Sequence, residues 1–269
     1  MLRILNAIGF IGHYFYILKN KVMEGLIHME NLLGEIIGTA VLTCMGCGVV
    51  ANVILKGNKG EGSGWIVITA GWGFACMLGV FTAVSLGAPQ ADLNPAVTLA
   101  KTMNGVYQPG HAVVTMVAET FGAFLGAIVA WAAYLPHWEA TEDQATKLGV
   151  FSTGPAIRSY GANFLCEAIG TFMLMFLIWV IFNANNGQLP AGFGPYLVGM
   201  LIWALGLSLG GPTGYAINPA RDLGPRIAHA ILPIPGKGGS DWAYSWVPIA
   251  GPMVGGAVAY VVAKAINLI

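Results

Sequence analysis

Two copies of the tripeptide Asn-Pro-Ala are the residues of this sequence best suited to binding chemistry. They are Asn94-Pro95-Ala96 and Asn218-Pro219-Ala220, and each opens a segment that is predicted to form a short helix within an apolar stretch. Proline is tolerated at the first helical position, because the N–H that it lacks would be unpaired there. The preceding asparagine can cap the helix with its side-chain oxygen, which leaves its amide hydrogens available to another partner.

Arg221 and Asp222 directly follow the second tripeptide. An arginine inside a bilayer costs about 2.5–3.5 kcal/mol on insertion scales, so it should be paired or face a water-filled cavity. Arg221 could brace a loop against Asp222 or backbone carbonyls, or it could line a pore, donate hydrogen bonds to a solute and repel cations. We favour the second interpretation, because Arg221 lies in the first turn of a helix whose cap should face the cavity.

Three further carboxylates lie in or beside apolar segments. Glu35 and Glu167 occupy matching positions, and we expect them to accept hydrogen bonds from irregular backbone rather than to relay protons. Asp92 lies two residues before Asn94. If it faces the mouth of a pore it would discourage anions and modulate permeation; the alternative is that its carboxylate only caps the turn before Asn94.

Composition places the chain in a membrane. Hydrophobic residues make up 56% of its 269 residues and charged residues 9%, against about 25% charged in an ordinary soluble domain. The net charge is zero, so nothing indicates a nucleic-acid partner. The cysteines and histidines form no metal-binding pattern, and no nucleophile is paired with a base. The sequence therefore predicts neither an enzyme nor a metal or other cofactor.

Six apolar segments are long enough to cross a bilayer, each needing about 20 residues. Residues 1–28 precede them and are partly apolar but too short to span comfortably, so two interpretations stay open: an N-terminal extension that forms a helix at the membrane surface, or a stretch that lies upstream of a true start at Met29. The six segments are Leu32 to Leu55, Trp65 to Leu86, Ala112 to Tyr134, Ala162 to Phe182, Phe193 to Leu209 and Trp246 to Ile266.

The sequence repeats itself. The pattern Glu-x-x-Gly-Thr recurs from Glu35 to Glu167, an offset of 132 residues, and the tripeptides are offset by 124. The pair Gly122 and Gly126 is matched to Gly251 and Gly255, an offset of 129. Each half thus has three crossings and one short helix that enters and returns. Because three is odd, the halves at about 30–135 and 160–268 should be inverted repeats of one channel domain, residues 29–269.

With these motifs in place, the chain resembles the major intrinsic protein (aquaporin) family over residues 30 to 268, and its glycerol-facilitator branch in Gly206 and Asp222. The resemblance implies an all-α membrane protein with six transmembrane helices and two re-entrant half-helices. It also implies a homotetramer in the cell membrane; basic residues near both ends suggest cytoplasmic termini. The resemblance further implies a selectivity constriction of Trp72, Gly206, Tyr215 and Arg221.

The expected activity is passive passage of glycerol and similar small neutral solutes, with some water, through the lipid bilayer. Ions would be excluded because dehydrating them is costly, and protons because the two asparagines orient the central water. Lactic acid, dihydroxyacetone, urea or hydrogen peroxide are alternative solutes. A coupled secondary transporter is an alternative of another class, but it would need an ionisable coupling site, and none is convincing in this sequence.

Overall fold

The computed structural model describes residues 31–190 and 192–269, and the surface segment expected at residues 1–28 lies outside the described residues. Within the described part, five helices are long and apolar enough to cross a membrane, and α8 is a shorter apolar helix. The five are Asn31–Ile54, α2 (Trp65–Ser85), α4 (Pro109–Ala133), α7 (Tyr160–Ile181) and α10 (Val247–Ala265). The predicted segments match these bounds within three residues, and α8 (Phe193–Leu209) begins and ends where expected.

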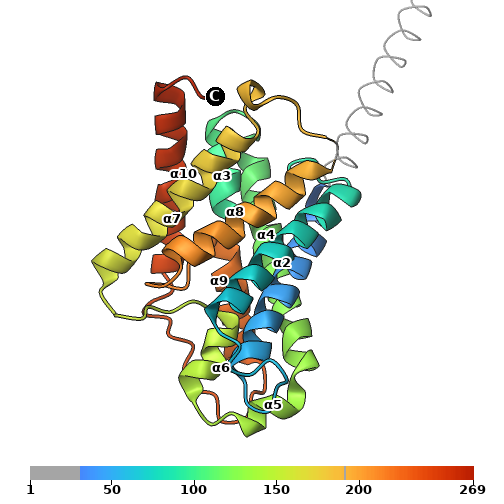
Figure 1. Cartoon of the computed structure of the whole chain (residues 1–269), viewed down its shortest axis with the longest axis vertical. Helices are drawn as coiled ribbons and strands as arrows, with labels where there is room; N and C mark the ends of the chain where they lie inside the picture. The colour runs from blue at the N-terminus through green and yellow to red at the C-terminus, as the bar shows by residue number, and fades with distance from the viewer. Residues whose placement is uncertain (1–30, 191) are drawn as a thin grey trace, which may run out of the picture.

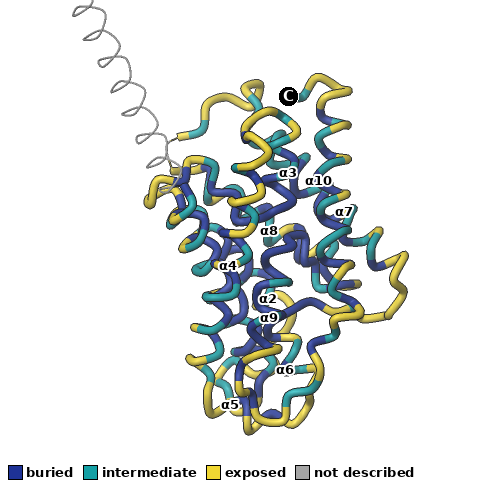
Figure 2. The backbone as a smooth tube through the Cα atoms, turned by 180° about the vertical axis from the view of Figure 1, so that it is seen from behind, coloured by how far each residue is buried: buried dark blue, intermediate teal, exposed yellow. Residues whose placement is uncertain are grey.

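Two short helices begin within the Asn-Pro-Ala tripeptides. These are α3 (Pro95–Met103) and α9 (Pro219–Ile231), and both begin with proline at the first helical position. From the centre of the molecule, α3 runs toward the end that carries the C-terminus, and α9 runs toward the opposite end (Figure 1). Most residues of α9 are buried (Figure 2). The all-helical architecture with two half-helices is therefore confirmed.

Glycines set the distance between neighbouring helices. A Cβ on Gly122 of α4 would lie 2.2 Å from the carbonyl oxygen of Ile36, and a Cβ on Gly255 of α10 would lie 2.2 Å from that of Ala168. Each pair of helices therefore touches backbone to backbone, as small residues allow in membrane bundles.

These contacts correct one feature of the repeat. The sequence pattern pairs Gly122 with Gly251, but by its contact Gly122 is equivalent to Gly255, because Ile36 and Ala168 are themselves 132 residues apart. The sequence pattern gave the wrong pairing because α10 carries several small residues. Of the two glycines in the pattern, Gly255 is the one that contacts the Ala168 carbonyl, which is the equivalent of the Ile36 carbonyl.

Each half-helix packs on a helix of the other repeat. α3 contacts α10, where a Cβ on Gly256 would lie 2.8 Å from the carbonyl oxygen of Ala96. α9 contacts α4, where a Cβ on Gly224 would lie 2.6 Å from the carbonyl oxygen of Thr120. The two repeats are therefore interlocked through their half-helices.

The link between the repeats contains two helices that the sequence analysis did not predict. They are α5 (Leu135–Ala140) and α6 (Gln144–Phe151), and they cover the end of the molecule toward which α9 points (Figure 1). Asp143 caps α6 by accepting a hydrogen bond from the Thr146 N–H at 2.7 Å. Trp138 and Phe151 stack with ring centroids 5.5 Å apart, which anchors both helices to the core.

The contact at Gly122 gives a direct test of the helix packing. Gly122→Ala should lower the free energy of unfolding by about 1–3 kcal/mol, because the added methyl group would overlap the Ile36 carbonyl. Gly110→Ala in the same helix is the matched control, since a Cβ there meets nothing within 4 Å. It should be neutral or slightly stabilising. Denaturation of the purified variants in detergent measures both, and equal effects would contradict the packing described.

Candidate functional site

The two capping asparagines hold the two repeats together at their centre. The side-chain amide of Asn94 donates to the carbonyl oxygen of Ile217 at 2.9 Å, and that of Asn218 donates to the carbonyl oxygen of Leu93 at 2.7 Å. Each asparagine thus binds the residue that directly precedes the other. The relation is reciprocal, as the inverted repeat requires.

The same side chains cap their own helices. Asn94 Oδ1 accepts from the Ala96 N–H at 3.0 Å, and Asn218 Oδ1 accepts from the N–H groups of Ala220 at 2.9 Å and Arg221 at 3.2 Å. An amide nitrogen carries two hydrogens, and the cross-repeat bond uses one of them. Both asparagines line the central cavity, so the second hydrogen is available there.

The backbone before each asparagine adopts an unusual conformation. Ala91 and Leu93 have φ of 43° and 52°, and Tyr215 and Ile217 have φ of 38° and 42°. Residues with side chains rarely occupy this left-handed region, and a β-branched residue such as Ile217 does so least readily. Such strain costs about 1–3 kcal/mol per residue and persists only where the surroundings impose it.

Two buried carboxylates impose this conformation. Glu35 accepts hydrogen bonds from the N–H groups of Asp92 at 3.0 Å and Leu93 at 2.9 Å. Glu167 accepts from those of Ala216 at 2.9 Å and Ile217 at 2.8 Å. Each carboxylate reaches from a membrane-crossing helix and uses both oxygens on one irregular segment. The geometry is that of a brace, the role we favoured for this pair.

A cavity of about 440 Å³ passes between these groups. Its lining combines the two irregular segments and both asparagines with apolar side chains of the membrane-crossing helices and α8, so the cavity is amphipathic. Its apolar lining includes Leu42, Val80, Leu174, Ile178, Val198 and Ile202.

Arg221 lies at the α9 end of this cavity. Its guanidinium carbon is 3.8 Å from the centre of the Trp72 ring, within the range of a cation–π contact. Its Nη1 donates to the carbonyl oxygen of Phe151 at 3.3 Å. Arg221 therefore combines both interpretations weighed from the sequence: a backbone carbonyl braces it, and it lines the cavity.

Tyr215 and Gly206 meet beside this arginine. A Cβ on Gly206 would lie 2.7 Å from Tyr215 Cζ, so only glycine leaves room for the ring. Trp65 fixes both residues: its ring packs edge-on against Tyr215 at 5.9 Å, and its Nε1 donates to the Gly206 carbonyl oxygen at 3.0 Å. Among the described residues, the Tyr215 hydroxyl and the Trp72 Nε1 are buried and have no hydrogen-bond partner.

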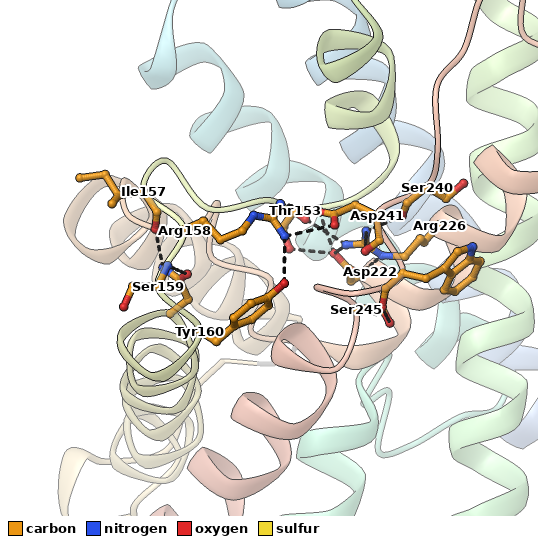
Figure 3. A network of polar contacts seen from close by, with 12 residues as sticks. Thr153, Ile157, Arg158, Ser159, Tyr160, Asp222, Arg226, Ser240, Asp241 and Ser245 are labelled. Atoms are coloured by element: carbon orange, nitrogen blue, oxygen red, sulfur yellow. Dashed lines mark hydrogen bonds and ion pairs between the residues drawn. The ribbon is translucent and has the colours of Figure 1, made fainter.

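Asp222 belongs to a separate buried network with Arg226 and Thr153 (Figure 3). Its ion pair is with Arg226 and not with Arg221. It accepts hydrogen bonds from Arg226 Nε at 2.8 Å and from the Thr153 N–H at 2.7 Å. Arg226 in turn donates to the carbonyl oxygen of Ser240 at 2.8 Å. This network ties α9 to the segment after α6 and to the loop before α10. The sequence analysis missed Arg226, although its spacing of four residues from Asp222 signals a pair on one helix face.

Asp92 is enclosed by hydrogen-bond donors. Its carboxylate accepts from the Lys101 ammonium, from the Tyr107 hydroxyl at 2.8 Å and from the Thr98 hydroxyl at 2.9 Å. The side chain is fully buried, whereas that of Lys101 is 17% exposed. Asp92 is therefore not a free charge at the mouth of the cavity. The sequence analysis did not single out these three partners.

One of the buried carboxyl groups must carry a proton. The Thr98 hydroxyl lies 2.9 Å from Asp92 Oδ2 and 2.8 Å from Glu119 Oε1. A hydroxyl has one hydrogen and can donate to only one of them, so the other carboxyl must donate. Glu119 fits that role, because it is fully buried, whereas Asp92 is paired with the Lys101 ammonium. An ionised Glu119 would be a buried charge with no cationic partner among the described residues, which is costly.

Replacing glutamate with glutamine distinguishes a carboxylate that accepts hydrogen bonds, Glu35, from a protonated carboxyl group that donates one, Glu119. Glu35→Gln places an amide donor against backbone N–H donors and should lower stability by about 1–3 kcal/mol. Glu119→Gln is the matched control, because a neutral amide can donate to Thr98 as the protonated acid does, and it should be nearly neutral. Unfolding in detergent measures both. Equal losses for the two variants would contradict the assigned proton.

Comparison with known proteins agrees with this geometry. The major intrinsic protein family model matches residues 23–262. The chain is 54% identical over 228 residues to glycerol uptake facilitator protein 3 of Lactiplantibacillus plantarum, covering 85% of this chain and 93% of that protein. It is 53% identical over 228 residues to a probable glycerol uptake facilitator protein of Thermotoga maritima, covering 85% and 95%.

A solved structure is similar over the same region. The X-ray structure of the aquaglyceroporin from Plasmodium falciparum superposes with a TM-score of 0.77 at 28% identity, covering 90% of this chain and 100% of that one. With two reciprocal capping asparagines at the centre of an all-helical membrane bundle and a family match over most of its length, the chain belongs to the major intrinsic protein family of membrane channels.

Proposed function

We propose that this protein is a passive channel for glycerol and related small neutral solutes, with some water permeability. The observation that carries the proposal is one amphipathic cavity that is lined by Asn94, Asn218 and Arg221. Further support comes from relatives more than half identical in sequence that are named glycerol uptake facilitators. The proposed transport is passive, so the solute moves down its own concentration gradient without an energy source.

A polyol fits the two sides of this cavity. Its hydroxyl groups can follow the polar side, accept hydrogen bonds from the asparagine amides and donate to backbone carbonyls. Its carbon backbone can face the aliphatic side chains opposite. The hydrogen bonds that the solute made with bulk water are thereby replaced by hydrogen bonds with the protein along the path. This replacement keeps the free-energy barrier to passage of a neutral solute low.

The proposed selectivity constriction is formed by Trp72, Gly206, Tyr215 and Arg221. Arg221 would donate to solute hydroxyls, and the aromatic rings would face the carbons. Gly206 would keep the constriction wide enough for more than water. Tyr215 adds a hydroxyl to this constriction, so dihydroxyacetone and lactic acid are alternative substrates to compare with glycerol.

Ions and protons would be excluded by the same groups. Neutral carbonyls beside a guanidinium do not compensate the dehydration of a cation. The N-terminal ends of α3 and α9 both point at the centre, and their positive partial charges oppose cations there. The amides of Asn94 and Asn218 would hold the central water with its oxygen toward them and interrupt a proton-hopping chain.

We further propose that the protein is a homotetramer in the cell membrane with both termini cytoplasmic. Large apolar side chains are exposed along the outer faces of the described helices, including Val113, Val117, Phe121, Leu165 and Val261. Some of these would face lipid and others a neighbouring subunit. Cross-linking in native membranes would count the subunits, and labelling of residues near the C-terminus from either side would test the orientation.

Solute flux on the purified protein tests the proposed function. Proteoliposomes containing the protein should swell faster than empty liposomes in an iso-osmotic glycerol gradient, without a pH or sodium gradient. Urea, dihydroxyacetone, lactic acid and hydrogen peroxide, measured in parallel, rank the alternative solutes. No glycerol flux above empty liposomes, or uptake that depends on an ion gradient, would refute the proposal.

The constriction gives a second prediction. Gly206→His combined with Tyr215→Phe should narrow the passage, because any side chain at Gly206 occupies the space that the Tyr215 ring fills. Glycerol flux should fall at least tenfold more than water flux, which corresponds to about 1.4 kcal/mol of added barrier for the larger solute. Stopped-flow light scattering measures both fluxes. Equal loss of both would argue against this constriction.

A further inference from the structure

Lys101 occupies the end of the cavity opposite Arg221. It lies in the last turn of α3, whereas Arg221 lies in the first turn of α9. Both residues line the same cavity. The Lys101 ammonium reaches back to the irregular segment, where it donates to the carbonyl oxygen of Gln90 at 3.1 Å and to the carboxylate of Asp92.

The Lys101 ammonium has one hydrogen-bond donor that is not used within the protein wall. An ammonium group carries three hydrogens, and the bonds to Gln90 and Asp92 use two of them. The side chain of Lys101 is 17% exposed and that of Asp92 is fully buried. One donor therefore remains beside the cavity, and it belongs to the lysine and not to the carboxylate.

The charge of this lysine is balanced within the wall. Asp92 pairs with it directly, and Tyr107 and Thr98 hold the carboxylate in place. Glu35 also lies nearby, on the backbone N–H of Asp92, and Glu119 contacts Thr98. A compensated ammonium can donate a hydrogen bond without acting as a strong attractor of anions.

The repeat shows that this arrangement is not inherited from the shared scaffold. With the 124-residue offset of the asparagines, Lys101 corresponds to Pro225 and Asp92 to Ala216. Likewise, Arg221 corresponds to Val97. Each half-helix therefore places one cationic donor in the cavity, but at different turns, so that the two donors lie toward opposite ends with the asparagines between them.

We propose that Lys101 is a second solute-contact residue, which donates a hydrogen bond to hydroxyl oxygens at the end of the channel opposite Arg221. Asp92 is its positioning residue, because it holds the ammonium against the wall and balances its charge. A polyol would begin to exchange its hydration for protein donors here, before it reaches the asparagines. Water, with a single oxygen, gains less from this contact. The inference rests on the proposed passage of glycerol.

A neutral double variant tests the contact. Asp92→Asn with Lys101→Met removes the donor, retains the aliphatic stem and leaves no unpaired charge in the wall. Glycerol permeability of proteoliposomes should fall about 2- to 10-fold, as expected for one lost hydrogen bond, and water permeability should stay within about twofold. Lys264→Met is the matched control, because Lys264 lies in the last turn of α10, is exposed and does not line the cavity. It should change neither flux.

A second variant decides the question should the double variant fail to fold. Lys101→Arg keeps the charge but extends a broader, forked donor into the cavity. It should change the ratio of erythritol to glycerol permeability at least twofold, with water flux retained. Unchanged ratios, or parallel loss of water and polyol flux in the double variant, would overturn the inference. A parent protein that passes no glycerol would instead refute the proposed function.

Discussion

The reciprocal hydrogen bonds between the two asparagines are the contacts on which the rest of the structure depends. Asn94 binds the carbonyl before Asn218, and Asn218 binds the carbonyl before Asn94. In the middle of a membrane, irregular backbone is tolerated only where protein or a cavity satisfies its polar groups. Separating the half-helices would break both bonds at once and free two amide donors and two carbonyl acceptors, so these contacts fix the point at which α3 and α9 meet.

The asparagines alone cannot hold the backbone that leads up to them. Each irregular segment contains two residues with side chains in the left-handed region, which together cost about 2–6 kcal/mol. Each segment also donates two N–H groups to one buried carboxylate, and two charge-assisted hydrogen bonds contribute about 3–6 kcal/mol. The two terms are of similar size, so one glutamate per segment is enough to maintain the strained backbone.

The sequence predicted what local patterns determine. Apolar runs located the crossings, and the tripeptides located the half-helices and their caps. The Glu-x-x-Gly-Thr repeat predicted the braces, because matching positions in inverted halves must face matching backbone. Other features depend on where distant segments meet. The last residue of α6, Phe151, places its carbonyl oxygen against Arg221, and Tyr107 reaches Asp92 from beyond the end of α3. No periodicity within either segment specifies such a contact, and the roles proposed for the constriction stay predictions.

Groups that are equivalent in the two repeats form the scaffold, whereas groups that differ between the repeats provide the contacts of the cavity. The groups that obey the symmetry are the asparagines, the braces and the left-handed residues, and they fix the backbone around the cavity. The groups that differ between the two repeats either line the cavity or support the residues that line it. Thr98 and Asp222 are equivalent by position, yet one bridges two carboxyl groups and the other anchors Arg226. Asp222 still supports the scaffold, because its network holds α9 to the neighbouring loops. The asparagines and braces do not depend on the cavity-lining donors Lys101 and Arg221, so substitutions at those two residues can change selectivity while the half-helices stay in place.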